Sequence, residues 1–302
     1  MSTAADAAAA EPAGVLSPRV LVPLALISLY LIWGSTYLAI RIALEGFPPF
    51  LMAAIRFPIA GGLMFAFLVW RGMPMPTPRQ WLNCLITGTL LLGIGNGLVC
   101  YAEQTVASGI AAVAVASVAL FIAIFAGLYG HWPSRLEWVG LIVGFAGVVV
   151  LNLGGELRGS PVGAAALVFA TLGWAFGSVW SRQQDMPQPM MSAAAQMLAG
   201  SVSLALIALL RGEHFSAVPG AHAIWAFVYL IVAGSILGFS AYIYLLHHTR
   251  PALASSYAYV NPPVAVLIGV LIAGESVHTF DLVGMAVILT GVVTITLART
   301  RR

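Results

Sequence analysis

The sequence predicts an all-α integral membrane protein with ten transmembrane helices, arranged as a five-plus-five repeat in which the second copy is inverted. Three observations predict this fold class. First, 61% of the 302 residues are hydrophobic and only 8% are charged, whereas soluble domains carry about 25% charged residues. Second, the chain divides into ten long apolar segments. Third, its two halves resemble each other at a fixed spacing.

The ten apolar segments are separated by short stretches that favour turns. Nearly all of them approach the ~20 residues that a helix needs to cross the hydrocarbon core of a bilayer. The breaks contain Gly and Pro, as at 46–49, 74–78 and 187–189, where helices commonly end. We expect helices over 20–43, 49–70, 81–101, 108–130, 136–153, 162–181, 190–210, 221–246, 252–273 and 280–298.

The internal repeat is clearest where residues 105–153 align without a gap on residues 249–297. An odd number of crossings in each copy turns the second copy over, which predicts a pseudo-two-fold axis in the membrane plane. We therefore expect a disordered cytoplasmic tail over 1–17, a first repeat over 18–154 and a second over 160–298. The matched positions are Thr105 with Thr249, Ala114 with Ala258, Gly130 with Gly274, 139–140 with 283–284, 147–149 with 291–293, Leu153 with Leu297 and, more weakly, Trp33 with Trp174 and Arg41 with Arg182.

The basic residues indicate orientation rather than a nucleic-acid partner. All thirteen are arginines, and they lie singly between apolar runs instead of forming a basic face. Basic residues in short loops stay on the cytoplasmic side, so both termini are expected in the cytoplasm of a bacterial-type inner membrane. That orientation leaves only Arg41, Arg158 and Arg211 outside and collects Arg19, Arg71, Arg79, Arg135, Arg182, Arg250, Arg299, Arg301 and Arg302 inside.

Several motifs occur together and in a fixed order. They are Trp33-Gly34-Ser35-Thr36-Tyr37 with Arg41, Gly95-Asn96-Gly97 before Ala102-Glu103-Gln104, Ser108-Gly109-Ile110-Ala111-Ala112, Trp174-Ala175-Phe176-Gly177-Ser178, and Ser256-Tyr257-Ala258-Tyr259-Val260-Asn261-Pro262 before Gly274-Glu275. In this combination the chain resembles the EamA-type branch of the drug/metabolite transporter (DMT) superfamily, and within it inner-membrane transporters of the YedA type. The resemblance implies a ten-helix carrier whose central cavity is lined by helices one, three, four, six, eight and nine. Related members export amino acids, other metabolites or toxic compounds.

The candidate substrate site consists of polar and aromatic residues that interrupt these apolar helices. Burying such groups in lipid is costly unless a cavity or a partner satisfies them. For a single Ser or Thr, the simpler interpretation is a small packing residue bonded to its own helix. Tryptophan near the midplane is less usual, because it favours the interfaces. The substrate-binding residues predicted in this way are Trp33, Thr36, Tyr37, Asn96, Tyr101, Trp174, Ser178, Ser235, Tyr257 and Asn261.

The Asn261-Pro262-Pro263 run marks the ninth segment. The two prolines remove the amide donors that would otherwise reach the carbonyls of Ala258 and Tyr259. Those carbonyls need other partners, either a neighbouring helix at a simple kink or the contents of a cavity.

Charged residues near the outer helix ends form a second set. Arg56 lies about two turns into the second segment, and Glu45, Glu103 and Glu275 fall at outer helix ends. An unpaired Arg at that depth is costly, so one of these carboxylates is expected to neutralise it. This pair is either a structural ion pair or part of a gate, with proton coupling through Glu103 as a further hypothesis.

The function predicted from these observations is secondary transport. The chain is expected to export a small amphipathic metabolite, such as an amino acid or a toxic analogue, by alternating access around a midplane cavity. Its expected partners are that solute and the bilayer, with no nucleic acid, and transport is either coupled to protons or passive. The alternatives are a multidrug or cationic-compound exporter and a non-transporting receptor or assembly protein. No convergent catalytic set or His-Glu-x-x-His spacing occurs in the sequence, so neither enzyme activity, a metal nor a cofactor is predicted.

Overall fold

The computed structural model describes residues 17–105, 108–152, 160–273 and 279–298. These residues form helices and turns and contain no strand. Two pairs of α-helices are each joined through a wide π-helical segment into one continuous run, Pro78–Ala102 and Ala221–His248. The elements are α1 (Pro18–Ala43), α2 (Pro49–Trp70), α3 (Pro78–Gly88), η1 (Thr89–Asn96), α4 (Gly97–Ala102), α5 (Ser108–Leu128), α6 (Arg135–Asn152), α7 (Pro161–Ser181), α8 (Pro189–Leu210), α9 (Ala221–Tyr229), η2 (Leu230–Phe239), α10 (Ser240–His248), α11 (Pro251–Ala254), α12 (Tyr257–Ala273) and α13 (Thr279–Ala298).

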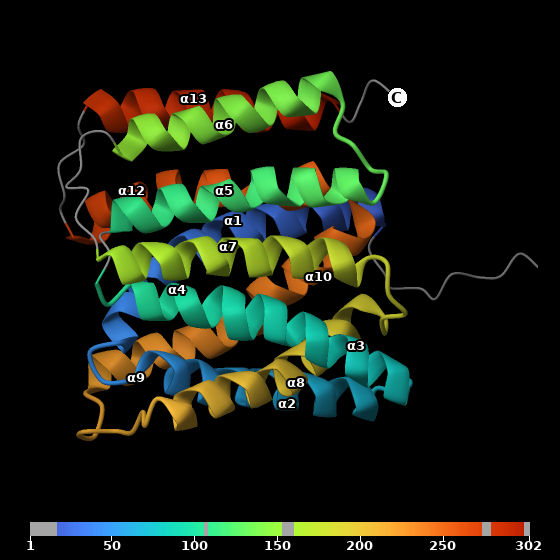
Figure 1. Cartoon of the computed structure of the whole chain (residues 1–302), viewed down its shortest axis with the longest axis vertical. Coiled ribbons are helices and arrows are strands. Elements are labelled where there is room, and N and C mark those ends of the chain that lie inside the picture. The colour runs from blue at the N-terminus through green and yellow to red at the C-terminus, as the bar shows by residue number, and fades with distance from the viewer. Residues whose placement is uncertain (1–16, 106–107, 153–159, 274–278, 299–302) are drawn as a thin grey trace, which may run out of the picture.

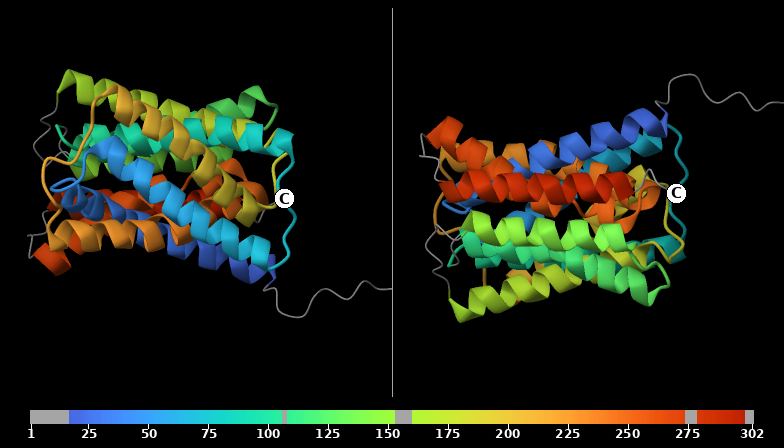
Figure 2. Two further views of the ribbon diagram at one scale, coloured as in Figure 1. Left: turned by 90° about the horizontal axis from the view of Figure 1, so that it is seen from below. Right: turned by 90° about the horizontal axis from the view of Figure 1, so that it is seen from above.

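The helices lie side by side along one common direction, and α1 begins at the same end of the bundle at which α13 ends (Figures 1 and 2). Of the described helical runs, six are long and apolar enough to cross a membrane: Pro18–Ala43, Pro49–Trp70, Pro78–Ala102, Pro161–Ser181, Pro189–Leu210 and Ala221–His248. Shorter apolar stretches cover Ala114–Leu128 and Leu282–Ala298.

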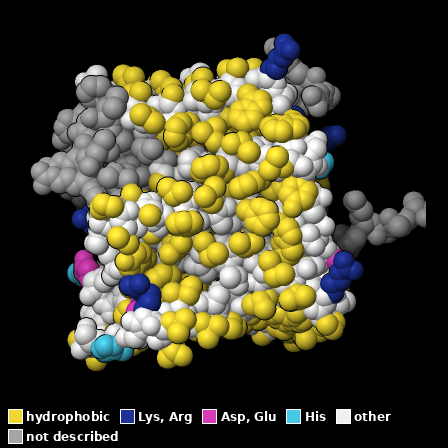
Figure 3. Space-filling view, in the orientation of Figure 1, with side chains coloured by type: hydrophobic (Ala, Val, Ile, Leu, Met, Phe, Trp, Pro, Cys, Tyr) yellow, Lys and Arg dark blue, Asp and Glu magenta, His cyan; other side chains and the backbone are white. Residues whose placement is uncertain are grey.

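The outer surface of the bundle is apolar along its middle. Leu31, Leu63 and Leu289 are more than half exposed, and Figure 3 shows hydrophobic side chains over the centre with charged ones near the two ends. A surface of this kind suits lipid rather than water. The prediction of an all-helical, multi-pass membrane protein is therefore confirmed.

Proline and glycine set the helix ends, as the sequence predicted. Pro18, Pro49 and Pro161 each occupy the first helical position, where the missing amide hydrogen costs nothing. Gly72 and Gly212 follow α2 and α8 with φ of 79° and 66°, a region that residues with a Cβ rarely adopt. The tail predicted over 1–17 and the loop at 153–159 lie almost entirely outside the described residues.

The interface between α6 and α13 is built from glycines that match in the internal repeat. A Cβ atom on Gly140 would lie 2.8 Å from the carbonyl oxygen of Gly291, and one on Gly147 would lie 3.1 Å from that of Gly284. Gly140 aligns with Gly284 and Gly147 with Gly291, so each contact becomes the other when the two copies are exchanged. Such reciprocal contacts are characteristic of a two-fold axis, and the small residues permit close approach of the backbones.

Candidate functional site

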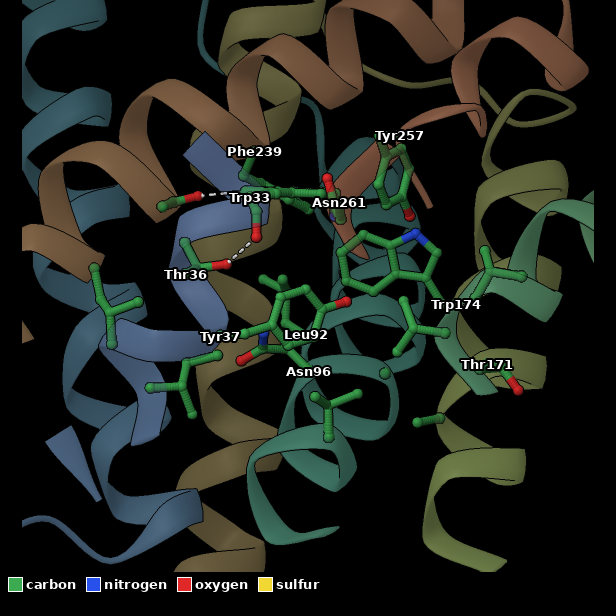
Figure 4. A pocket seen from close by; sticks show the side chains of 18 of the residues that line it. Trp33, Thr36, Tyr37, Leu92, Asn96, Thr171, Trp174, Phe239, Tyr257 and Asn261 are labelled. Atoms are coloured by element: carbon green, nitrogen blue, oxygen red, sulfur yellow. Dashed lines mark hydrogen bonds between the residues drawn. The ribbon is translucent and has the colours of Figure 1, made fainter. Parts of the chain in front are cut away.

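A cavity of about 100 Å³ lies in the half of the bundle that contains the second half of α1 and the first half of α2. It is several times larger than the ~10–15 Å³ that one water occupies on this measure. Its walls come from α1, α2, α4, α5, α7, α12 and the two π-helical segments, so both halves of the chain contribute (Figure 4). The lining residues used below are Trp33, Thr36, Tyr37, Arg56, Asn96, Thr171, Trp174, Phe239, Tyr257 and Asn261.

Four aromatic rings pack together beside this cavity, and those of Trp33, Trp174 and Tyr257 line it. The ring centroids of Trp33 lie 5.5 Å from Trp174, 5.4 Å from Tyr242 and 4.9 Å from Tyr257. Tyr242 in turn lies 5.4 Å from Trp174 and 5.5 Å from Tyr257. Edge-to-face and tilted pairs at these separations are favourable and specific in geometry. We call these four residues the aromatic floor.

Tyr242, Trp174 and Ser178 form hydrogen bonds with one another within and next to the aromatic floor. Trp174 Nε1 donates to the hydroxyl oxygen of Tyr242 at 3.1 Å. Ser178 donates to the carbonyl oxygen of Trp174 at 2.6 Å, so its oxygen is left to accept the hydroxyl hydrogen of Tyr242 at 2.5 Å. This closed loop of hydrogen bonds removes the cost of burying the three groups.

Both tryptophans pack on glycines of the opposite half of the chain. Trp33 Nε1 donates to the carbonyl oxygen of Gly234 in η2 at 3.1 Å, and a side chain at Gly238 would collide with the Trp33 ring. Likewise, a Cβ atom on Gly95 in η1 would lie 2.7 Å from the Trp174 ring. The two π-helical segments occupy matching positions in the repeat, and wide turns of this kind are frequent at functional sites.

Arg56 is the charged residue in the cavity wall. Its side chain is 3% exposed, its Nη2 donates to Asn96 Oδ1 at 2.7 Å, and its guanidinium carbon lies 4.3 Å from the centre of the Phe57 ring. Its Nε is buried without an acceptor. Asn96 Oδ1 also accepts from Cys100 Sγ at 3.6 Å, so the amide oxygen of Asn96 is held toward Arg56.

Asn261 supplies an unpaired acceptor on another wall. It is 2% exposed, and its Oδ1 is buried with no hydrogen-bond partner. By contrast, Thr36 donates to the Trp33 carbonyl at 2.8 Å and Thr171 to the Val168 carbonyl at 2.9 Å. The two threonines thus behave as packing residues bonded to their own helices.

Most of the predicted substrate residues therefore lie together. Trp33, Thr36, Tyr37, Asn96, Trp174, Tyr257 and Asn261 line the cavity. Three others do not. Ser178 lies below the aromatic floor, Ser235 is buried in η2, and Tyr101 packs against Phe50 and under the guanidinium of Arg211.

The predicted charge set is more dispersed. The hydrogen-bond partner of Arg56 is the amide of Asn96, and no described carboxylate lies within ion-pair distance of Arg56. Glu103 follows α4, seven residues or about 10 Å of helix beyond Asn96, and acts on Arg56 through its charge. Glu45 is exposed in the turn after α1, and Glu275 lies outside the described residues.

Two features were not assigned from the sequence. Tyr242 is not among the substrate-binding residues predicted from the sequence, yet it contacts three other rings and completes the hydrogen-bond loop. Thr171 and Phe239 also line the cavity. The sequence did contain one indication of a close contact in this region. Gly234 and Gly238 are four residues apart, and small residues at helical spacing allow a neighbouring helix to approach closely.

Comparisons with known proteins agree with this architecture. The chain is 46% identical over 284 residues to the uncharacterized inner membrane transporter YedA of Escherichia coli, covering 93% of each chain. It is 24% identical to the uncharacterized transporter YoaV of Bacillus subtilis, covering 93% of this chain and 98% of that one. A solved crystal structure with 23% identity matches the fold with a TM-score of 0.76 over 93% of this chain and 99% of the other.

The motifs described above predicted the family correctly. The model of the EamA-like transporter family matches twice, over residues 21–153 and again over residues 161–297. Together with the identity to YedA, these two matches establish that the chain belongs to the EamA-like transporter family.

Proposed function

We propose that this protein is a secondary transporter of the inner membrane that exports a small amphipathic metabolite, such as an amino acid or a toxic analogue. The observation that carries the proposal is the cavity itself. It lies between both halves of the chain and combines aromatic faces with a few polar groups, which is the usual composition of a small-molecule site.

Alternating access around this cavity is part of the proposal. The cavity lies on one side of the aromatic floor, and a second cavity of about 480 Å³ lies on the other, bounded by Glu137, Arg182, His247 and Arg250. In a carrier, rocking of one repeat against the other opens the site to each side in turn. The aromatic floor is then the gate that is closed in this conformation.

Two inverted repeats of five helices, over 18–154 and 160–298, would supply the rocking units. The reciprocal glycine contacts of α6 and α13 support this division, as do the two family matches. The relative YedA is named as an inner membrane protein, which supports the same location here.

Purified protein in proteoliposomes tests the function. Vesicles loaded with radiolabelled amino acids should lose label faster than protein-free vesicles, and Trp33→Ala and Trp174→Ala should slow the loss. Leu289→Ala, on the lipid-facing surface of α13, is the matched control. Absence of flux for every solute, with folded protein verified, would favour the receptor or assembly role instead.

Export of cationic drugs is the second candidate, and the aromatic floor favours it. Ring faces attract cations by about 0.5 to 2 kcal/mol. Arg56 in the same wall opposes it, because a cation entering the cavity meets a buried like charge.

A further inference from the structure

Arg56 presents an electrostatic imbalance inside the cavity. A buried guanidinium in the membrane region is costly unless an opposite charge compensates it. Its hydrogen-bond partner, Asn96, is a neutral amide, and Glu103 acts on it only from beyond ion-pair distance. Arg carries five donor hydrogens, and Nε is buried without an acceptor.

The surroundings hold the guanidinium in one position. The bond from Nη2 to Asn96 Oδ1 and the Phe57 ring below it fix its plane. With its oxygen bound by Arg56 and Cys100, Asn96 has a donor amide nitrogen left for other partners. This wall of the cavity is therefore a preorganised set of donors.

The opposite polarity occurs on α12. Asn261 Oδ1 is a buried acceptor without a partner, and Tyr257 and the two tryptophans offer ring faces nearby. Donors on α2 and η1 thus line the same cavity as an acceptor on α12 and the aromatic rings. Figure 4 shows Asn96 and Asn261 in this lining.

We propose that Arg56 and Asn96 bind the carboxylate of the transported solute, so that the substrates are small carboxylates and, with Asn261 taking the ammonium group, α-amino acids. The inference rests on the proposed transport function, whose substrate class it specifies. A planar guanidinium matches a carboxylate with two parallel hydrogen bonds. The incoming charge would neutralise Arg56, and an amine without a carboxylate lacks this compensation.

Matched probes separate carboxylate recognition from amine recognition. L-valine carries both groups, isovalerate only the carboxylate, and valinamide and isobutylamine only the amine. Alanine, propionate, alaninamide and ethylamine form the same set at smaller size. Calorimetric titration of the purified full-length protein should detect binding of the probes that carry a carboxylate, which are valine and isovalerate in one set and alanine and propionate in the other. Binding of the amines and amides alone, or of none of the eight probes, would overturn the proposal.

Variants of the donor wall locate the interaction. Arg56→Gln should weaken binding of valine and isovalerate by about 10- to 100-fold, as expected for loss of charge-assisted hydrogen bonds. Arg211→Gln is the control, because Arg211 also lies over aromatic rings but pairs with Glu213 outside the cavity. Unchanged affinity in Arg56→Gln would overturn the proposal.

Asn96→Asp covers the case in which Arg56→Gln fails to fold. The new carboxylate would stand 2.7 Å from Arg56 and form an internal ion pair that competes with the ligand. We expect folded protein with acid affinity reduced by a similar factor, and wild-type affinity in this variant would contradict the proposal. Acids that bind but show no flux in proteoliposomes would refute transport while leaving the carboxylate site standing.

Discussion

The hydroxyl group of Tyr242 joins two helices through a single buried loop of hydrogen bonds. It accepts from Trp174 and donates to Ser178, and Tyr242 itself is fully buried. Removing the hydroxyl leaves the indole N–H of Trp174 without its acceptor and Ser178 without one of its bonds. The packing of the ring is retained, so any loss of stability measures the contribution of these hydrogen bonds alone.

Tyr242→Phe should therefore lower the stability of the folded protein by about 1–3 kcal/mol, the cost of leaving a buried polar group unsatisfied. Thermal unfolding in detergent measures the change. Tyr244→Phe is the control, because Tyr244 stacks on His248 at 4.1 Å outside this loop. Equal stability of the two variants would show that the loop contributes nothing beyond ring packing.

Glu103 provides a pH-dependent group just beyond α4. Burial raises the pKa of Glu103 to about 8, against the lowering effects of Arg41 and Arg56. Cys100 and Tyr37 also interact with its charge. Because the folded pKa lies above the ordinary value of a carboxyl group, the folded protein holds this proton more tightly than the unfolded chain. The associated stabilisation is complete at low pH and is lost as the pH rises through about 8.

We expect the wild-type protein to lose more thermal stability between pH 6 and pH 9 than Glu103→Gln, which cannot titrate at this position. Comparing the two proteins removes the contribution of the histidines, which both contain. Glu45→Gln, at an exposed carboxylate, should behave like wild type. Identical pH profiles for wild type and Glu103→Gln would exclude Glu103 as the titrating group and, with it, its suitability for proton coupling.

At the scale of the helix, the sequence predicted where helices end better than which side of a helix is turned toward the cavity. Pro and Gly at the helix ends can be read directly in the sequence. A helix that is apolar on all sides gives no indication of which side lines a cavity. Tyr101 illustrates this limit. It follows Asn96 by five residues, about 140° around an ideal helix, and so points to Arg211 while Asn96 points into the cavity. The wide π-helical turns of η1 and η2 rotate the following residues further around the helix axis, and the spacing of apolar residues does not reveal these turns.

The start of α6 is tied to the turn before α11 by one buried carboxylate. Glu137 is 2% exposed, accepts from the Ser134 backbone amide at 2.7 Å and lies 2.9 Å from Arg250 Nη2. The backbone N–H of Glu137 in turn donates to Ser134 Oγ at 3.3 Å, which completes a capping box. One side chain therefore caps a helix and links two elements beside the second cavity.

Glu137→Gln keeps a capping oxygen but removes the charge, and Arg250→Gln removes the partner. In a double-mutant cycle we expect a coupling of about 1 kcal/mol, modest because Arg250 is partly exposed. Unfolding of the two single variants and the double variant in detergent supplies the four free energies. Strictly additive losses would mean that the ion pair does not hold these elements together.

At the scale of the whole molecule, the internal repeat places equivalent residues of the two halves in different roles. Trp33 and Trp174 occupy matching positions and meet in the aromatic floor. Asn261, Pro262 and Pro263 of α12, however, correspond to residues 117–119 of α5, which are Ser, Val and Ala. The symmetric parts could be predicted from the repeat itself. The first half has no asparagine at the position that matches Asn261, and the buried, unpartnered oxygen of Asn261 results from tertiary packing that the sequence does not show.

The orientation of the molecule in the membrane is the remaining prediction, and it follows from the arginines. The end of the bundle where α1 begins and α13 ends (Figures 1 and 2) holds most of the arginines that the structure describes, namely Arg19, Arg71, Arg79, Arg135, Arg182 and Arg250. Basic residues next to the membrane in short loops remain cytoplasmic. Reporters fused after residue 302 and within 74–78 should therefore report the cytoplasm, and one within 156–160 should report the periplasm. Because three of the expected crossings, over 81–101, 108–130 and 136–153, lie between these two sites, finding the fusions at 74–78 and 156–160 on the same side would refute the inverted-repeat topology. Periplasmic signals at both 302 and 74–78 would refute the orientation alone.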